Sequence, residues 1–196
     1  MSRIIAGRAK GMRLASPKGD STRPTTDRVK EALFSSLATW FGTVDSDPAR
    51  QLADVAVLDL FSGSGGLGLE AASRGAARVV CVDNRTSAVI RDNAARTGLP
   101  VEVNGGSVDA ALKSPPGRFD LVLLDPPYDL AGETVDRILG RLLAAEVLLA
   151  DALVVLERSS RSAPPVWPAQ FTDVWDRRYG ESTLHFGAFR DAEEPQ

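Results

Sequence analysis

The sequence is poor in the residues that cross-link or ligate small proteins. Its 196 residues include one cysteine, Cys81, and one histidine, His185. A single cysteine cannot form an intramolecular disulfide, and one cysteine with one histidine cannot build a Cys/His zinc cluster. A chain of this length buries enough apolar surface to fold without such supports. We therefore expect no disulfide and no metal site.

Long apolar runs are also missing. The longest, residues 142–156, is interrupted by Glu146 and Asp151, and a membrane-spanning helix needs about 18 or more apolar residues. The first 14 residues lack the apolar core of a signal peptide. The composition, 43% hydrophobic and 25% charged, is that of an ordinary globular domain. The sequence thus predicts a soluble, cytoplasmic, monomeric protein that does not contact membranes.

Charge is distributed unevenly along the chain, although the net charge is only −3. Residues 1–30 contain eight basic and two acidic side chains, and the rest of the chain is acidic. This pattern is typical of a protein that approaches phosphate with one segment, although a solvated arm without contacts gives the same pattern. Apolar residues flank Gly7 and Gly11 as in a short hairpin. We therefore expect residues 1–20 to form a basic β-hairpin extension.

The main domain, expected at residues 21–190, shows an alternation of helical and strand patterns. Thr26 and Asp27 precede an apolar stripe with helical spacing that leaves Lys30 and Glu31 outside it. Short apolar runs predict parallel strands at 55–60, 77–82, 99–103, 119–124 and 152–157, with helices from 67, at 85–97 and at 133–149. A closing hairpin is expected at 172–179 and 182–189, before a tail at 191–196. The prediction is an α/β, Rossmann-like fold, with helices on both faces of a mostly parallel sheet.

A glycine-rich turn, residues 63–68, follows the first strand and opens a helix. Such turns let a ligand approach the backbone, but they serve several adenosine-containing cofactors and also occur without a ligand. Two acidic residues indicate which of these cofactors fits. Asp83 ends the second strand, where it can accept hydrogen bonds from ribose hydroxyls. Asp59 precedes the glycines, where a carboxylate would repel a pyrophosphate but suits the ammonium group of S-adenosylmethionine, directly or through water.

Asp109 follows the third strand and has two interpretations. It can accept from an adenine amino group while the Val108 amide donates to the ring, or it can cap a helix at residues 110–113.

Asp125-Pro126-Pro127-Tyr128 directly follows the fourth strand. Two prolines fix the backbone and remove two donors, so that the Asp125 side chain and the Pro126 carbonyl can both accept from one NH₂ group. Tyr128 offers a flat face to a ring. Exocyclic nucleobase amines are poor nucleophiles because the nitrogen lone pair is conjugated. Two fixed acceptors make that nitrogen more tetrahedral, so the tetrapeptide is typical of amino-nitrogen methylation. A rigid turn without this function is the alternative.

These motifs together resemble class I methyltransferases that act on amino nitrogens. The opening, Arg3 to Gly7 and then RPTTDRVKEALF at residues 23–34, and the end around Tyr179-Gly180 and Thr183 resemble the bacterial RsmD-like family. Ser35 and Ser36 depart from that pattern. The resemblance implies a seven-stranded sheet and S-adenosylmethionine-dependent methylation of the 2-amino group of one guanine in 16S ribosomal RNA of the 30S subunit.

The resemblance also implies roles for individual residues. Arg23, Pro24 and Thr25 would lie near the methionine end of the cofactor, with Arg28 and Glu31 bordering the site. The expected cofactor-binding residues are Arg23, Thr25, Asp59, Phe61, Gly63, Ser64, Gly65, Asp83, Asn84, Val108 and Asp109. The expected catalytic residues are Asp125, Pro126, Pro127 and Tyr128. The expected RNA-binding residues are Arg3, Arg8, Lys10 and Arg13.

Three other functions fit parts of the sequence. A DNA adenine methyltransferase would use the same tetrapeptide, although this chain has no room for a separate target-recognition domain. A non-catalytic RNA-binding factor would have no need of the intact Asp125–Tyr128 motif. A nicotinamide oxidoreductase is disfavoured by Asp59.

Overall fold

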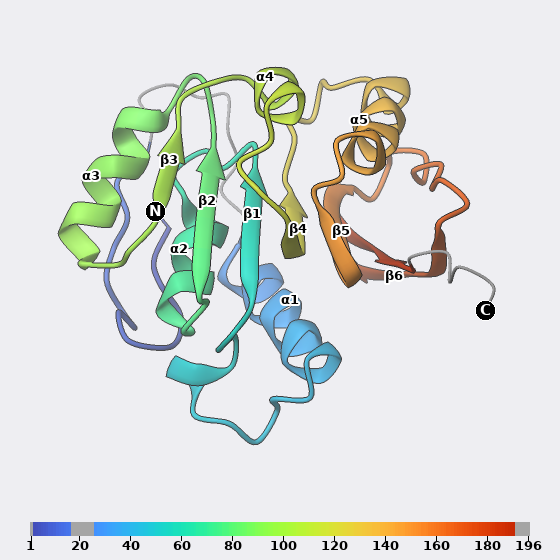
Figure 1. Cartoon of the computed structure of the whole chain (residues 1–196). Coiled ribbons are helices and arrows are strands. Elements are labelled where there is room, and N and C mark those ends of the chain that lie inside the picture. Colours follow the sequence, from blue (N-terminus) through green and yellow to red (C-terminus); the bar gives the residue numbers. More distant parts are fainter. Residues whose placement is uncertain (1, 17–25, 191–196) are drawn as a thin grey trace.

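The computed structural model describes residues 2–16 and 26–190, which form a three-layer α/β/α sandwich around one sheet (Figure 1). The sheet has seven strands in the order β3-β2-β1-β4-β5-β7-β6. The strands are β1 Ala56–Leu60, β2 Arg78–Val82, β3 Glu102–Asn104, β4 Phe119–Leu124, β5 Leu148–Ser159, β6 Phe171–Tyr179 and β7 Ser182–Phe189. The first five are parallel, and β7 is antiparallel to both β5 and β6. The Rossmann-like, mostly parallel sheet predicted from the sequence is confirmed.

Five α-helices connect and flank the strands. They are α1 Asp27–Trp40, α2 Gly66–Ser73, α3 Ser87–Thr97, α4 Val108–Lys113 and α5 Gly132–Ala144, with a short 3₁₀ turn at Pro48–Arg50. Thr26 caps α1 as the sequence predicts, since its hydroxyl oxygen accepts from the Val29 amide at 3.3 Å.

Alternation along the strands divides the core into two layers. In β1, β2 and, from Leu121 onward, β4, the odd-numbered side chains, such as Val57 and Val79, pack on the same side as α1, α2 and α3. The even-numbered ones, such as Leu58 and Val122, pack with α4 and α5. Because successive strand side chains point to opposite faces, near-continuous apolar strands require helices on both sides.

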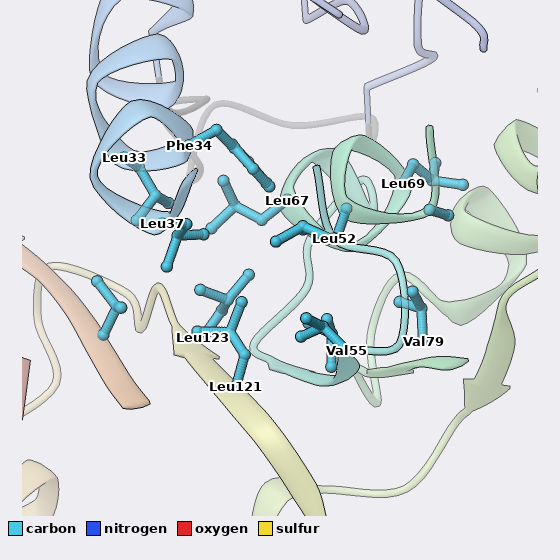
Figure 2. Close-up of a cluster of buried hydrophobic side chains, with 14 of the residues drawn as sticks. Leu33, Phe34, Leu37, Leu52, Val55, Leu67, Leu69, Val79, Leu121 and Leu123 are labelled. Carbon is cyan, nitrogen blue, oxygen red and sulfur yellow. The ribbon is translucent and has the colours of Figure 1, made fainter. Parts of the chain in front are cut away.

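Helix α1 covers the sheet beside α2. Figure 2 shows Leu33, Phe34 and Leu37 of α1 directed toward Leu67 of α2 and Leu123 of β4. Each of the three α1 side chains is at most 1% exposed. The apolar stripe read from the sequence is therefore the buried face of the helix. The same face also takes in Lys30, which is 1% exposed, so the prediction that Lys30 lies outside the buried face is wrong.

The boundary between α5 and β5 differs from the prediction. The sequence predicts a helix to residue 149, but α5 ends at Ala144 and β5 begins at Leu148. Glu146 adopts a positive φ of 52°, which turns the chain back toward the sheet. Apolar periodicity could not locate this turn because apolar residues continue through it.

The N-terminal segment, residues 2–16, packs against α2 and α3. One antiparallel bridge joins Arg3 to Arg13, and no named strand forms in the described part of the segment. Ile4 is fully buried and Leu14 is 2% exposed, so both belong to the core. Gly7 has a φ of 78°, and a Cβ there would lie 2.0 Å from the Ser73 carbonyl oxygen. The segment is thus closely joined to the domain.

No helix within residues 2–16 and 26–190 is long and apolar enough to cross a membrane.

Candidate functional site

Among the predicted site residues, Asp59, the glycine turn and Asp125 lie where the strand order reverses. Strands β1 and β4 are neighbours, β2 and β3 extend to one side of β1, and β5 lies on the other side of β4. In open α/β sheets this switch point, at the carboxyl ends of the strands, is where ligands bind. The Asp125 amide donates to the Leu60 carbonyl at 3.4 Å, which places the Asp125 motif next to the end of β1.

The glycine turn leads from β1 into α2. Gly63 and Gly65 have φ values of 56° and 80°, which side-chain-bearing residues rarely adopt. A Cβ on Gly63 would meet nothing within 4 Å, so the backbone at Gly63 faces open space that a ligand can enter, whereas a Cβ on Gly65 would lie 3.1 Å from Ile90. Gly68 has a different role: a Cβ there would lie 2.5 Å from Cys81 Sγ. It permits close packing of α2 on β2.

Asp59 is 1% exposed and lies directly beneath the turn. Its Oδ2 accepts from the Gly68 amide at 2.9 Å, whereas its Oδ1 is buried without a hydrogen-bond partner among the described residues. Burial raises the pKa of the Asp59 carboxyl to about 7. An unsatisfied buried carboxylate oxygen beside an open glycine turn fits the ammonium group of S-adenosylmethionine.

Asp83 links the end of β2 to the glycine turn. Its Oδ2 accepts from the Gly63 amide at 3.0 Å, and its Oδ1 accepts from the Arg85 and Thr86 amides. The carboxylate is half-buried, and a carboxylate has about four acceptor positions. These contacts orient the side chain and leave acceptor capacity for ribose hydroxyls. Asn84, the next residue, is exposed.

Asp109 lies in the first turn of α4, and its carboxylate is paired with Arg141 of α5. The Arg141 guanidinium also donates to the Asp109 carbonyl at 2.9 Å. The helix cap is Ser107, whose hydroxyl oxygen accepts from the Ala110 amide, so the capping interpretation of Asp109 is wrong. Val108, beside it, is 8% exposed.

The Asp125–Tyr128 motif is held at both ends. Besides the bond to Leu60, the Leu130 amide donates to the Pro127 carbonyl at 3.0 Å. Arg158, at the carboxyl end of β5, donates to the Leu130 carbonyl at 2.9 Å. Asp125 is half-buried and Tyr128 is 51% exposed. A stiff bend with an exposed aromatic ring therefore stands at the switch point.

The four predicted RNA-binding residues are all exposed. Arg3 and Arg13 form the bridge, and Arg3 is paired with Asp27 at 2.7 Å. Arg8 lies at the far end of α2, where its amide donates to the Ser73 carbonyl. The segment that carries them therefore runs along α2, from Ser2 beside Gly66 at the amino end of the helix to Arg8 at its carboxyl end. Arg3 and Arg13 thus lie on the part of the segment nearer the glycine turn, and Arg8 lies farther from it.

Several predicted residues stand apart from these contacts. Arg23, Pro24 and Thr25 lie outside the residues that the structure describes. Arg28 and Glu31 are exposed on α1, and Phe61, at the end of β1, has a positive φ of 61°. Residues with such backbone conformations cluster at functional sites. Among the described residues, no group of three or more His, Cys, Asp or Glu side chains could hold a metal ion.

Sequence reasoning missed three buried polar residues that position the site. Glu70 of α2 is fully buried and accepts from the Ile5 and Ala6 amides at 2.8 and 3.0 Å. Asn93 of α3 and Arg158 of β5 likewise bond to distant backbone. A possible signal was the placement of Glu70 and Asn93 on apolar helix faces, where a polar residue needs a partner.

The strand order, the glycine turn with its acids and the bend after β4 define a class I, S-adenosylmethionine-dependent methyltransferase. The chain belongs to the family described as Conserved hypothetical protein 95, whose model matches residues 2–188. Together with the similarity to Ribosomal RNA small subunit methyltransferase D described next, this match confirms the RsmD-like family predicted from the sequence.

Named relatives are similar to the chain over much of its length. It is 35% identical over 178 residues to Ribosomal RNA small subunit methyltransferase D of Escherichia coli K12, covering 87% of this chain and 81% of that protein. It is 38% identical over 133 residues to Putative rRNA methyltransferase YlbH of Bacillus subtilis, covering 64% and 66%. The solved structure of the putative methyltransferase yhhF from Escherichia coli superposes with a TM-score of 0.79 at 26% identity, covering 97% and 99%.

Proposed function

We propose that the protein transfers a methyl group from S-adenosylmethionine to the exocyclic 2-amino group of one guanine in 16S ribosomal RNA of the 30S subunit. The observation that carries this proposal is the proline-stiffened Asp125 bend beside the glycine turn at the sheet's switch point. The relatives, one named as a ribosomal RNA small subunit methyltransferase and the other as a putative rRNA methyltransferase, support the substrate class. We propose that the protein acts as a monomer, in which one chain supplies Asp59, Asp83 and Asp125.

The cofactor supplies a methyl group on a sulfonium, which is already an excellent leaving group. The chain's own residues have to hold and orient it. The backbone at Gly63–Gly65 would bind the amino-acid part, with Asp59 opposite its ammonium group. Asp83 would accept from the ribose, and Val108 and Asp109 would contact the adenine. Because Arg141 pairs with the Asp109 carboxylate and donates to the Asp109 carbonyl, α5 would help to hold the adenine site in shape.

The acceptor side works by placement and hydrogen bonding. The Asp125 carboxylate and the Pro126 carbonyl would both accept from the guanine NH₂ and direct its lone pair toward the methyl carbon. The proton leaves the nitrogen after methyl transfer, and Asp125 is the nearest acceptor in this arrangement. A guanine within paired or stacked RNA must be turned out of the stack first, and Tyr128 or Phe61 would then stack on it.

Radiolabelled S-adenosylmethionine tests this function. We expect methyl transfer to small ribosomal subunits isolated from cells that lack the protein, with the product mapped by mass spectrometry to the 2-amino group of a single guanine. Duplex DNA should be a poor substrate. Labelling of DNA without labelling of ribosomal RNA would instead establish the DNA adenine alternative.

The pH dependence of cofactor binding provides a second prediction. An ammonium group favours ionised Asp59, but with a pKa of about 7 this carboxyl is mostly protonated at pH 6. Affinity should therefore rise with pH, by up to about 8-fold between pH 6 and 7.5, where an α-amino group is still largely protonated. Calorimetric titration of S-adenosylmethionine measures this rise. Asp59→Asn cannot ionise and should abolish it; a pH-independent wild-type affinity would contradict the assigned role.

A third prediction concerns the basic N-terminal residues. Since Ile4 and Leu14 are core residues, deleting the segment would unfold the domain, so charge removal is the sharper test. The triple substitution Arg8→Gln, Lys10→Gln, Arg13→Gln should weaken RNA binding and reduce the magnitude of the slope of log K against log salt by about 2–3, because each phosphate contact contributes about 0.7–0.9.

The triple substitution Arg137→Gln, Arg177→Gln, Arg178→Gln is the matched control, because all three residues are exposed and lie on α5 and β6. Its salt slope should stay close to that of the wild type. Equal slopes for the triple variant and the wild type would show that the basic segment is only a solvated face.

A further inference from the structure

Asn93 is a buried amide that bonds to two separate functional segments. Only two residues of α3, Ile90 and Asn93, are buried, and Asn93 is fully so. Its Nδ2 donates to the Ser64 carbonyl at 2.9 Å and to the Ala15 carbonyl at 3.0 Å. Its Oδ1 accepts from the Ala15 amide at 2.8 Å. Both donors and one acceptor position of the amide are therefore used.

The two partners of Asn93 belong to different predicted sites. Ser64 is the middle of the glycine turn that would hold the cofactor. Ala15 belongs to the N-terminal segment that carries the predicted RNA contacts, and in the chain it precedes Arg23. The Asn93 amide thus joins two backbone segments that are 49 positions apart in the sequence.

We infer that Asn93 is a positioning residue that couples cofactor binding to RNA binding; this inference rests on the proposed function. A cofactor that orders the glycine turn fixes the Ser64 carbonyl, and through it the Asn93 amide and the backbone at Ala15. The N-terminal segment is then already partly ordered by the cofactor, so it loses less conformational entropy when it binds RNA. Coupling between two binding sites is reciprocal, so RNA must tighten cofactor binding by the same factor.

The contact pattern favours this role over simple core filling. An apolar side chain could fill the same space, but it would leave the Ser64 carbonyl and both backbone groups of Ala15 without this partner. The Asn93 amide bonds only to backbone groups among the described residues. These groups belong to the glycine turn, which would bind the cofactor, and to the N-terminal segment, which would bind RNA. Glu70 also bonds to the N-terminal segment, but its other partners among the described residues are Arg74 and Lys30, neither of which lies in the glycine turn.

The test measures affinity for unmethylated small subunits with and without saturating S-adenosylhomocysteine, which cannot donate a methyl group. In the wild-type protein the cofactor product should tighten subunit binding by about 5-fold, at the lower end of common allosteric couplings. In Asn93→Ala the ratio of the subunit affinity with S-adenosylhomocysteine to the affinity without it should fall to one. In the control Thr97→Val, which removes only hydrogen bonds within α3, the wild-type ratio should persist.

Asn93→Asp is a second variant, because it keeps the acceptor for the Ala15 amide and loses both donors; its ratio should also fall to one. Hydrogen exchange on the wild-type protein needs no variant: S-adenosylhomocysteine should increase protection of the Ala15 amide. A wild-type ratio of one, an unchanged ratio in the Asn93 variants or unchanged Ala15 protection would overturn the coupling. None of those results would contradict the proposed function, which a separate measurement tests. If the proposed function is wrong, the wild-type protein transfers no methyl group to the subunit.

Discussion

Replacing Asp125 with alanine should lower the methylation rate about 10²–10³-fold, the range seen when one preorganised hydrogen-bonding group is removed from a transition state. The variant loses one of two acceptors for the guanine NH₂, so the nitrogen lone pair is no longer directed at the methyl carbon. The Asp125 amide, which bonds to Leu60, is retained. Single-turnover kinetics with small subunits measures the rate, and S-adenosylmethionine affinity should change little.

Asp129→Ala is the matched control for this prediction. Asp129 is an exposed acid in the same loop, four residues from Asp125 in sequence. Its removal changes the local charge equally and should leave the rate within a few-fold of wild type. If Asp125→Ala turned over normally, the bend would not act on the nucleophile, and the proposed chemistry would be wrong.

The second large effect is expected for Glu70→Gln, which should lower the free energy of unfolding by about 3–5 kcal/mol. Glu70 is the only acid paired with Lys30 and Arg74 in the described structure, at 3.9 and 2.9 Å, and both cations are at least 93% buried. Glutamine leaves two buried cations without a counter-ion. The melting temperature should fall by roughly 6–20 °C for a domain of this size.

Glu133→Gln serves as the control, because Glu133 is exposed at the start of α5. Its unfolding free energy should stay within about 0.5 kcal/mol of wild type. Urea unfolding followed by circular dichroism compares the three proteins. If Glu70→Gln lowers the free energy of unfolding by less than about 1 kcal/mol, then water or a rearranged side chain stabilises the two cations in place of Glu70.

Much of the fold follows from local patterns in the sequence. The strand at 119–124 has the predicted bounds, and the hairpin strands differ by at most one residue. Continuous apolar runs indicated buried parallel strands, and glycines and prolines marked the turns. The predicted boundaries of helices and strands were wrong where apolar residues continue through a turn, as at Glu146 between α5 and β5. There the backbone conformation, and not the composition, ends the helix.

The sequence by itself determined the chemistry: an acid before a glycine turn, an acid after the second strand, and a proline-stiffened bend after the fourth. Each of these motifs is a short stretch of consecutive residues, so it can be recognised without knowledge of the fold. Only the tertiary structure decided which polar groups support them. Asn93 meets Ser64 and Ala15, and Glu70 meets Ile5, across tens of residues of chain. Such partners are selected by packing, because a buried polar group must bond to whatever backbone the folded layers bring beside it.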